Sequence, residues 1–182
     1  MATYKYDYSI GLDMEFPFKP KDKVNWPVLA ITAASIFISI GLLSYMDQNL
    51  DNIYVITSFG ATAVLIYGAP KAPFSRPKNV FFGHLFSALI GVAVAWTFNE
   101  LGLYDDLKWF AVGFGVMLAI VVMLLTDTTH PPGGATALAC VYSGFFGLEY
   151  VFRPFMFGIC IMLAIAFVAN WLKAKFEKEG NR

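Results

Sequence analysis

Charge is scarce in this 182-residue chain: Asp, Glu, Lys and Arg make up 14% of it, against roughly a quarter in an ordinary soluble domain. Thirteen Lys and Arg balance thirteen Asp and Glu, so no net field attracts nucleic acid. Cysteine is scarce too, and Cys140 and Cys160 both lie in apolar runs, which argues against a secreted disulfide framework. Hydrophobic residues reach 58% and the mean hydropathy is +0.60. The composition excludes a disordered tail and a nucleic-acid-binding protein, and it predicts that the lipid bilayer is the solvent.

Six apolar runs account for this hydropathy. They contain no Asp, Glu, Lys or Arg and cover residues 27–46, 53–69, 80–98, 109–126, 131–148 and 154–172. As helices, runs of this length cover roughly the 30 Å hydrocarbon core. The second and fifth runs are short and contain glycines, so full spans, broken helices and re-entrant hairpins all remain open for them.

The positions of Lys and Arg favour one topology, because cations near membrane helices tend to stay in the cytoplasm. Six crossings with both termini inside leave only Lys108 and Arg153 outside, against eleven cations inside. Four crossings with two re-entrant runs give nine inside and four outside. We therefore expect six segments and cytoplasmic termini. Residues 1–26 form a cytoplasmic or interfacial segment, 27–172 one transmembrane domain and 173–182 a charged cytoplasmic tail.

An internal repeat divides the membrane region. The sequence Gly60-Ala61-Thr62-Ala63 recurs as Gly134-Ala135-Thr136-Ala137, each in the middle run of three. This predicts an all-α fold of two pseudo-symmetric units, about 27–98 and 107–172. The units are inverted if every run crosses and parallel if the middle runs are re-entrant. In both cases the two middle runs meet near a pseudo-twofold axis, where transporters place their substrate. Duplication for packing alone is the other interpretation.

Small residues recur every four positions in three runs, which places them on one face of each predicted helix. Such faces let helix backbones approach closely in lipid. Packing within the chain is the simplest role, and one face could instead support a homo-oligomer. The three sets are Gly83, Ser87, Gly91 and Ala95; Ala111, Gly115 and Ala119; and Pro131, Ala135, Ala139, Ser143 and Gly147.

The most unusual local sequence runs from Thr126 to Thr136, TDTTHPPGGAT. Proline disfavours helical geometry in the residue before it, so we expect His130 and Pro131 to be extended and Pro132 to begin a helix. The preceding helix then ends near Asp127. Glycyl amides at the new N-terminus would carry the positive end of the helix dipole.

At this point the chain resembles the HPP family of integral membrane proteins. The matching residues are His130-Pro131-Pro132-Gly133-Gly134-Ala135-Thr136-Ala137-Leu138, with further likeness in residues 59–65 and 68–70 and in Gly83-His84. Gly133 stands where we expect Ala. The resemblance covers residues 27–172 and implies a bacterial, archaeal or plastid membrane protein. Some plastid and cyanobacterial members act in nitrite transport, and many others have no assigned substrate. The family is usually described with four spans, whereas the charges here favour six.

The candidate site combines helix N-termini with uncharged donors, because no cation lies within any run. We expect a small anion to bind near the bilayer midplane, weakly enough to be released. The expected binding residues are Ser58, Gly60, Ala61, Thr62, His130, Gly133, Gly134, Ala135 and Thr136. His84, Asp127, Pro131 and Pro132 are the expected gating or structural residues. Asp127 would pair with His130 or cap the new helix, and His130 would bond a carbonyl across the break.

The residues therefore predict a permease or channel for a small anion, and the resemblance points to nitrite. We expect no catalysis, no cofactor and no metal, with the bilayer and the anion as partners and a prokaryotic plasma membrane as the location. One alternative is a membrane scaffold whose small-residue faces recruit partners. Another is a zinc-dependent intramembrane enzyme using His84, His130 and Asp127, although their spacing matches no local ligand pattern.

Overall fold

The computed structural model describes residues 24–49 and 57–179 and is helical throughout, with no strand in those ranges. The predicted N-terminal segment lies almost wholly outside the described residues. The helices, in chain order, are α1 Trp26–Asn49, α2 Thr57–Ala63 with its π-helical continuation η1 Val64–Gly68, the 3-10 turn η2 Pro73–Ser75, α3 Pro77–Glu100, α4 Lys108–Leu125, α5 Pro131–Tyr142, the π-helical turn η3 Val151–Met156, and α6 Phe157–Glu179.

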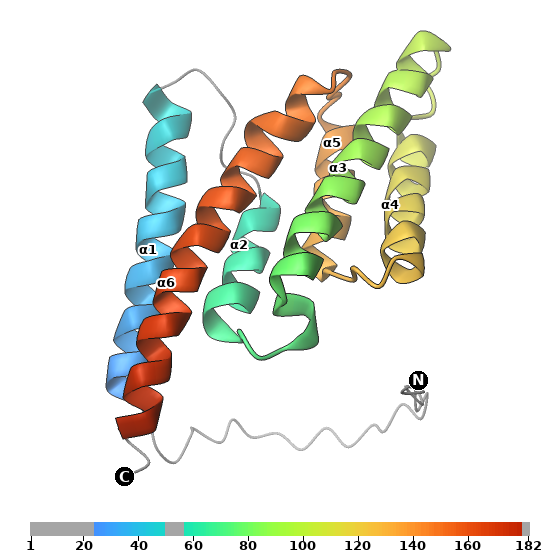
Figure 1. Ribbon diagram of the computed structural model, residues 1–182. Coiled ribbons are helices and arrows are strands. Elements are labelled where there is room, and N and C mark those ends of the chain that lie inside the picture. Colours follow the sequence, from blue (N-terminus) through green and yellow to red (C-terminus); the bar gives the residue numbers. More distant parts are fainter. Residues whose placement is uncertain (1–23, 50–56, 180–182) are drawn as a thin grey trace, which may run out of the picture.

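Within residues 24–49 and 57–179, four helices are long and apolar enough to cross a membrane: α1, α3, α4 and the continuous η3–α6. Thr57–Gly68 and the 12-residue α5 rise only about 18 Å each, less than the hydrocarbon core. The second and fifth runs are therefore short, as predicted. Figure 1 shows the chain changing direction at each successive helix from α1 to α6. The six-segment inverted repeat is not confirmed by four candidate spans, and it stays a prediction.

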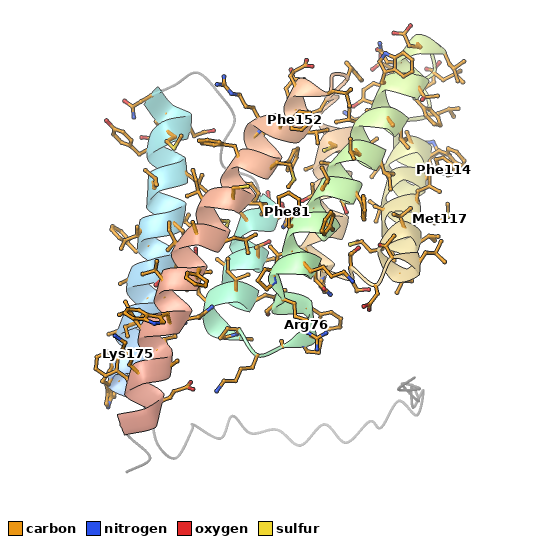
Figure 2. All side chains as sticks on the ribbon, viewed as in Figure 1. Arg76, Phe81, Phe114, Met117, Phe152 and Lys175 are labelled. Atoms are coloured by element: carbon orange, nitrogen blue, oxygen red, sulfur yellow. The ribbon has the colours of Figure 1, made fainter. Side chains whose placement is uncertain are left out.

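Most of the described Lys and Arg residues lie at one end of the bundle, and Lys108 and Arg153 lie at the other (Figure 1). Arg76 and Lys175 lie at the end where α1 begins and α6 finishes, and Phe152 lies at the other (Figure 2). Lys71 pairs with Glu177 at 2.8 Å at the first of these ends. Between the ends, apolar side chains such as Phe114 and Met117 point outward from α4 (Figure 2). This arrangement, with a chain that avoids charge between its ends, is that of an integral membrane protein.

The tightest packing joins α3, α4 and α5. The predicted small-residue faces of α3 and α4 take part in it, but the predicted face of α5 is wrong: Pro131, Ala135 and Ser143 are exposed, and α5 packs through the neighbouring face instead. A Cβ on Gly91 would lie 2.7 Å from Cys140 Cβ and 2.9 Å from the Ala137 carbonyl oxygen. A Cβ on Gly115 would lie 2.9 Å from a methyl of Val141. The faces on α3 and α4 are therefore used inside the chain, and a homo-oligomer stays a prediction.

Replacement of Gly91 by alanine tests this packing. The added methyl group would meet backbone atoms of Ala137 as well as a side chain, so α3 and α5 must move apart. Gly91→Ala should therefore destabilise the fold by about 1–3 kcal/mol. Gly113→Ala is the matched control, because a Cβ there meets nothing within 4 Å and alanine is the better helix former. Thermal unfolding in detergent should give a lower midpoint for the first variant only. Equal midpoints would mean that the α3–α5 contact is looser than described.

The short α2–η1 segment is held by α6. Its last carbonyls have no partner within the segment, and α6 supplies donors: Asn170 Nδ2 donates to the Ile66 oxygen at 3.1 Å and Lys173 Nζ donates to the Tyr67 oxygen. Lys173 is only 4% exposed. The predicted tail, residues 173–182, begins within α6, which continues to Glu179. Lys173, its first residue, caps the C-terminal end of η1, where a cation is favoured.

Removal of this cap should loosen the segment. Lys173→Met leaves the Tyr67 carbonyl buried without a donor and should cost about 1–3 kcal/mol of unfolding free energy. Lys175→Met is the control, since Lys175 lies 3.6 Å above the Trp171 ring on the exposed side of α6, a contact worth about 0.5–1 kcal/mol. Denaturation followed by tryptophan fluorescence compares the two. A larger loss in the control would contradict the capping role.

The connection between α4 and α5 positions His130. Asp127 has a positive φ of 52°, and the Thr128 amide donates to the Met123 carbonyl at 3.0 Å, which closes the end of α4 as a Schellman turn does. Asn79 of α3 holds the connection through the Thr129 carbonyl at 3.0 Å. His130 is extended (φ −138°, ψ 102°), as predicted.

Two local predictions in this connection need correction. Pro131 is not extended: it is the first residue of α5, because its fixed φ suits the first helical position. Asp127 neither pairs with His130 nor caps α5. Its carboxylate is exposed and lies 3.6 Å from Lys78 Nζ, while its backbone ends α4.

A buried histidine–threonine cluster

The repeated threonines meet on one imidazole ring. Thr62 Oγ1, from α2, lies 2.8 Å from His84 Nε2, and Thr136 Oγ1, from α5, lies 2.8 Å from His84 Nδ1. All three side chains are fully buried. The two Gly-Ala-Thr-Ala segments therefore converge as predicted, and a histidine of α3 stands between them.

A second imidazole joins the cluster from the α4–α5 connection. His130 Nδ1 donates to the Phe74 carbonyl of η2 at 2.8 Å, and His130 Nε2 lies 3.2 Å from Thr62 Oγ1. The centroids of the two histidine rings are 4.9 Å apart. His130 thus bonds a carbonyl, as predicted, but on η2 rather than across its own helix break. Ser58 Oγ completes the cluster at 2.9 Å from Thr136 Oγ1.

The partners fix the protons when both rings are neutral. A carbonyl can only accept, so His130 carries its proton on Nδ1. The Thr62 hydroxyl faces two acceptors, the Ser58 carbonyl at 3.0 Å and His130 Nε2 at 3.2 Å, and donation to Nε2 is the choice that leaves no ring nitrogen unpaired. That hydroxyl has one proton, so His84 Nε2 must in turn donate to Thr62 Oγ1. His84 Nδ1 then accepts from the Thr136 hydroxyl. Each ring nitrogen has a partner, as burial in an apolar region requires.

Aromatic and glycyl contacts close the cluster. The Phe59 ring meets the edge of His84, with centroids 6.1 Å apart, and it lies over Gly158 of α6, where a Cβ would be 2.5 Å from Phe59 Cε2. A Cβ on Gly83 would lie 2.6 Å from His130 Cβ. Only glycine at these two positions lets the rings approach. In this conformation the cluster is sealed from water and lipid.

Other predicted binding residues lie outside the cluster. Gly60, Ala61 and Ala135 are exposed on the outer faces of α2 and α5, and Gly134 is half-buried. Gly133 packs against α3: its Cβ would lie 2.9 Å from the Gly83 carbonyl oxygen. Glycine at this position allows the backbones of α5 and α3 to lie close together.

The predicted cradle of bare helix-terminal amides does not form part of the cluster. Pro131 and Pro132 have no N–H, and the Gly133 amide already donates to the His130 carbonyl at 2.8 Å. The first turn of α5 therefore has little donor capacity left. The groups that converge are hydroxyls and imidazoles.

The three ligands of the zinc alternative do not converge. His84 and His130 lie together, but the Asp127 carboxylate faces Lys78 and is 96% exposed. Among residues 24–49 and 57–179, no three His, Cys, Asp or Glu side chains are placed to share a metal ion. The donor set of the cluster is two imidazoles and hydroxyls.

Comparison with known proteins agrees with the resemblance of the motif. The family described as HPP, transmembrane region, matches residues 21–178. The chain belongs to the HPP family. Two transmembrane proteins of Dictyostelium discoideum are similar to it: one is 34% identical over 88% of this chain and 56% of its own length, the other 37% identical over 82% and 48%. The chain spans about half the length of these relatives. No solved structure matches it significantly.

The HPP motif thus has a defined geometry in this protein. His130 bonds η2 and Thr62, Pro131 begins α5, Pro132 is buried in its first turn, and Thr136 reaches His84 one and a half turns later. Phe74 and Asn79, which hold the motif in place, were not predicted. No periodicity marked them, because one contributes a backbone carbonyl and the other a single side-chain bond.

The Thr62 hydroxyl should be the most costly one to remove. Thr62→Val leaves His130 Nε2 without a donor and the His84 Nε2 proton without an acceptor, which should cost about 1–3 kcal/mol of unfolding free energy. Thr97→Val is the control: that hydroxyl, exposed on α3, bonds only the Ala93 carbonyl of its own helix at 2.8 Å. Thr62→Ser should recover most of the loss. If both valine variants unfold at the same temperature, the network is not as described.

Proposed function

We propose that this HPP protein is a membrane permease for a small inorganic anion, with nitrite as the first candidate substrate. The observation that carries the proposal is the bridge made by His84 between Thr62 and Thr136. Buried polar residues at membrane depth are costly and usually functional. Here they come from both copies of a repeated segment, at the place where repeat-built transporters bind substrate.

The donors suit a small anion that must leave again. Hydroxyl and imidazole N–H groups can coordinate an oxyanion without a fixed positive charge. The ion pairs formed by Lys71 with Glu177 and by Lys78 with Asp127 lie at the end of the bundle and involve neither ring. Binding through uncharged donors is weak enough for release, which transport requires. Nitrite itself is suggested by the family and not by the geometry.

The proposed pathway includes the inverted arrangement of the two units. The alternating helix directions in Figure 1 support this arrangement, since two three-helix units then begin on opposite sides. His84 is the eighth residue of α3, about 10 Å along the axis from the cation-rich end. That end is proposed to be cytoplasmic, because most described Lys and Arg lie there, and the membrane is proposed to be the plasma membrane of a prokaryote.

The described conformation is an occluded one. Thr62, His84, His130 and Thr136 have no exposed surface, so an anion reaches them only if helices separate. The segment best placed to move is α2–η1, which is short, contains a π-helical turn of the kind found at functional sites, and is held at its far end by side chains of α6.

A flux assay tests the proposal. Purified protein in liposomes should take up nitrite in a saturable way, with nitrate, formate and chloride measured in parallel. Thr136→Val should lower the uptake at least tenfold, since a lost donor to a charged ligand costs about 1.5–3 kcal/mol. Thr32→Val is the control, because its hydroxyl bonds the Val28 carbonyl within α1 at 2.9 Å. Absence of uptake of all four anions by the wild-type protein would refute the proposal.

A further inference from the structure

We infer that the cluster binds one proton together with each anion, so that the protein carries a monovalent anion and a proton across the membrane as a neutral pair. This inference rests on the proposed function and adds the coupled ion. It is carried by the hydrogen-bond geometry of His84, whose two ring nitrogens each face a threonine hydroxyl at 2.8 Å. A hydroxyl can donate to a nitrogen or accept from it.

In the neutral cluster, one arrangement of the hydrogen bonds pairs every ring nitrogen, and its donors all point the same way. Starting from α5, the Thr136 hydroxyl donates to His84 Nδ1, His84 Nε2 donates to Thr62, Thr62 donates to His130 Nε2, and His130 Nδ1 donates to the backbone. The chain of donors therefore runs from α5 to the η2 carbonyl at the cation-rich end. Two ring nitrogens accept in this pattern, His84 Nδ1 and His130 Nε2, and the Thr62 hydroxyl beside His130 can also turn to the Ser58 carbonyl at 3.0 Å. We assign the proton to His84 Nδ1, because the Thr136 hydroxyl beside it has two other acceptors rather than one.

The protonated cluster also satisfies its donors. When His84 Nδ1 takes a proton, that N–H donates to Thr136 Oγ1, and the hydroxyl proton of Thr136 must find another acceptor. Two are in place: Ser58 Oγ at 2.9 Å and the Pro132 carbonyl oxygen at 3.4 Å. The remaining bonds are unchanged. The cluster thus has one complete hydrogen-bond pattern without the proton and a second with it.

The cluster holds one added proton and not two. With ring centroids 4.9 Å apart, two imidazolium ions would repel strongly in a region of low dielectric. A single positive charge at this depth is itself unfavourable without a counter-ion. An anion beside the ring supplies that counter-ion, and the ring supplies the charge that the pathway otherwise lacks. Binding of the proton therefore favours entry of the anion, and binding of the anion favours uptake of the proton.

Other ionisable groups on the surrounding elements face away from the two rings. Asp127 and Lys78 face each other, Lys173 and the Tyr67 hydroxyl donate to backbone carbonyls of η1 and α6, and Cys140 packs on Gly91. Arg76, Tyr142, Arg153 and Cys160 are exposed, and Lys108 lies 4.5 Å above the Tyr142 ring. The proton is therefore assigned to the histidine pair.

The step conserves atoms and charge. On entry, the anion and one proton leave the same aqueous phase, the proton forms an N–H bond with the Nδ1 lone pair of His84, and the net charge of the cluster with its anion is zero. On release to the other phase, that N–H bond breaks and Thr136 again donates to Nδ1. No oxidant, reductant or covalent intermediate is required.

The test measures protons and anions together in the wild-type protein. Liposomes containing the protein and a luminal pH dye receive an inward nitrite gradient at alkaline pH, with protein-free liposomes as the baseline for leakage of nitrous acid. We expect luminal acidification of one proton for each nitrite taken up, and a flux that does not respond to a potassium–valinomycin membrane potential. Uptake without acidification, accelerated by an inside-positive potential, would overturn the inference.

Variants locate the proton. His84→Gln keeps an N–H donor toward Thr62 but offers no basic nitrogen, so any nitrite flux that remains should lose its proton. His130→Asn keeps the N–H donor toward Phe74 and removes the other accepting nitrogen, Nε2. Loss of the proton in this variant, with coupled flux kept in His84→Gln, would place the proton on His130 and overturn the assignment. Coupled flux that persists in folded His84→Gln would contradict the assignment. If that variant does not fold, the number of protons taken up per nitrite by the wild-type protein decides the inference. Wild-type protein that moves none of the four anions refutes the proposed function, whereas uncoupled flux refutes only this inference.

Discussion

The structure depends on one requirement: a buried imidazole in a membrane protein needs a hydrogen-bond partner on each nitrogen. His84 finds both partners on threonines that belong to two different short helices. Because α2 and α5 each rise only about 18 Å, neither is a complete membrane span, and this bridge ties both to the long helix α3. The glycines at positions 83 and 158 are consequences of the same requirement, since a Cβ at either would displace His130 or Phe59.

The bridge is asymmetric, although the two Gly-Ala-Thr-Ala segments that it joins have the same sequence. At the repeat offset that aligns Thr62 with Thr136, His84 corresponds to Gly158 and Phe59 to Gly133. One unit thus places a histidine where the other has glycine, and the Phe59 ring occupies the space left over Gly158. One ring serves both threonines.

Sequence patterns predicted the helices, the short second and fifth segments and the convergence of Thr62 with Thr136, because apolar runs and a repeated tetrapeptide are visible along the chain. The spacing of small residues predicted the packed faces of α3 and α4 but not that of α5. These patterns missed that His84 is the centre of the cluster, since a single histidine in an apolar run has no pattern around it. They also predicted free amides at the start of α5, where Pro131 has none. Lys173 was assigned to a tail because its partner, the Tyr67 carbonyl, lies 106 residues away in sequence.

The geometry of the two rings can be observed directly, because His84 and His130 are the only histidines in the chain. Nitrogen NMR of tag-free protein, labelled with ¹⁵N-histidine and embedded in lipid, reports which nitrogen of each ring carries a proton. The account predicts two fixed and opposite tautomers at neutral pH, Nε2–H for His84 and Nδ1–H for His130, with Thr136→Val shifting the His84 signals and leaving those of His130 in place. Rings that exchange between tautomers as a free imidazole does, and that do not respond to Thr136→Val, would contradict it.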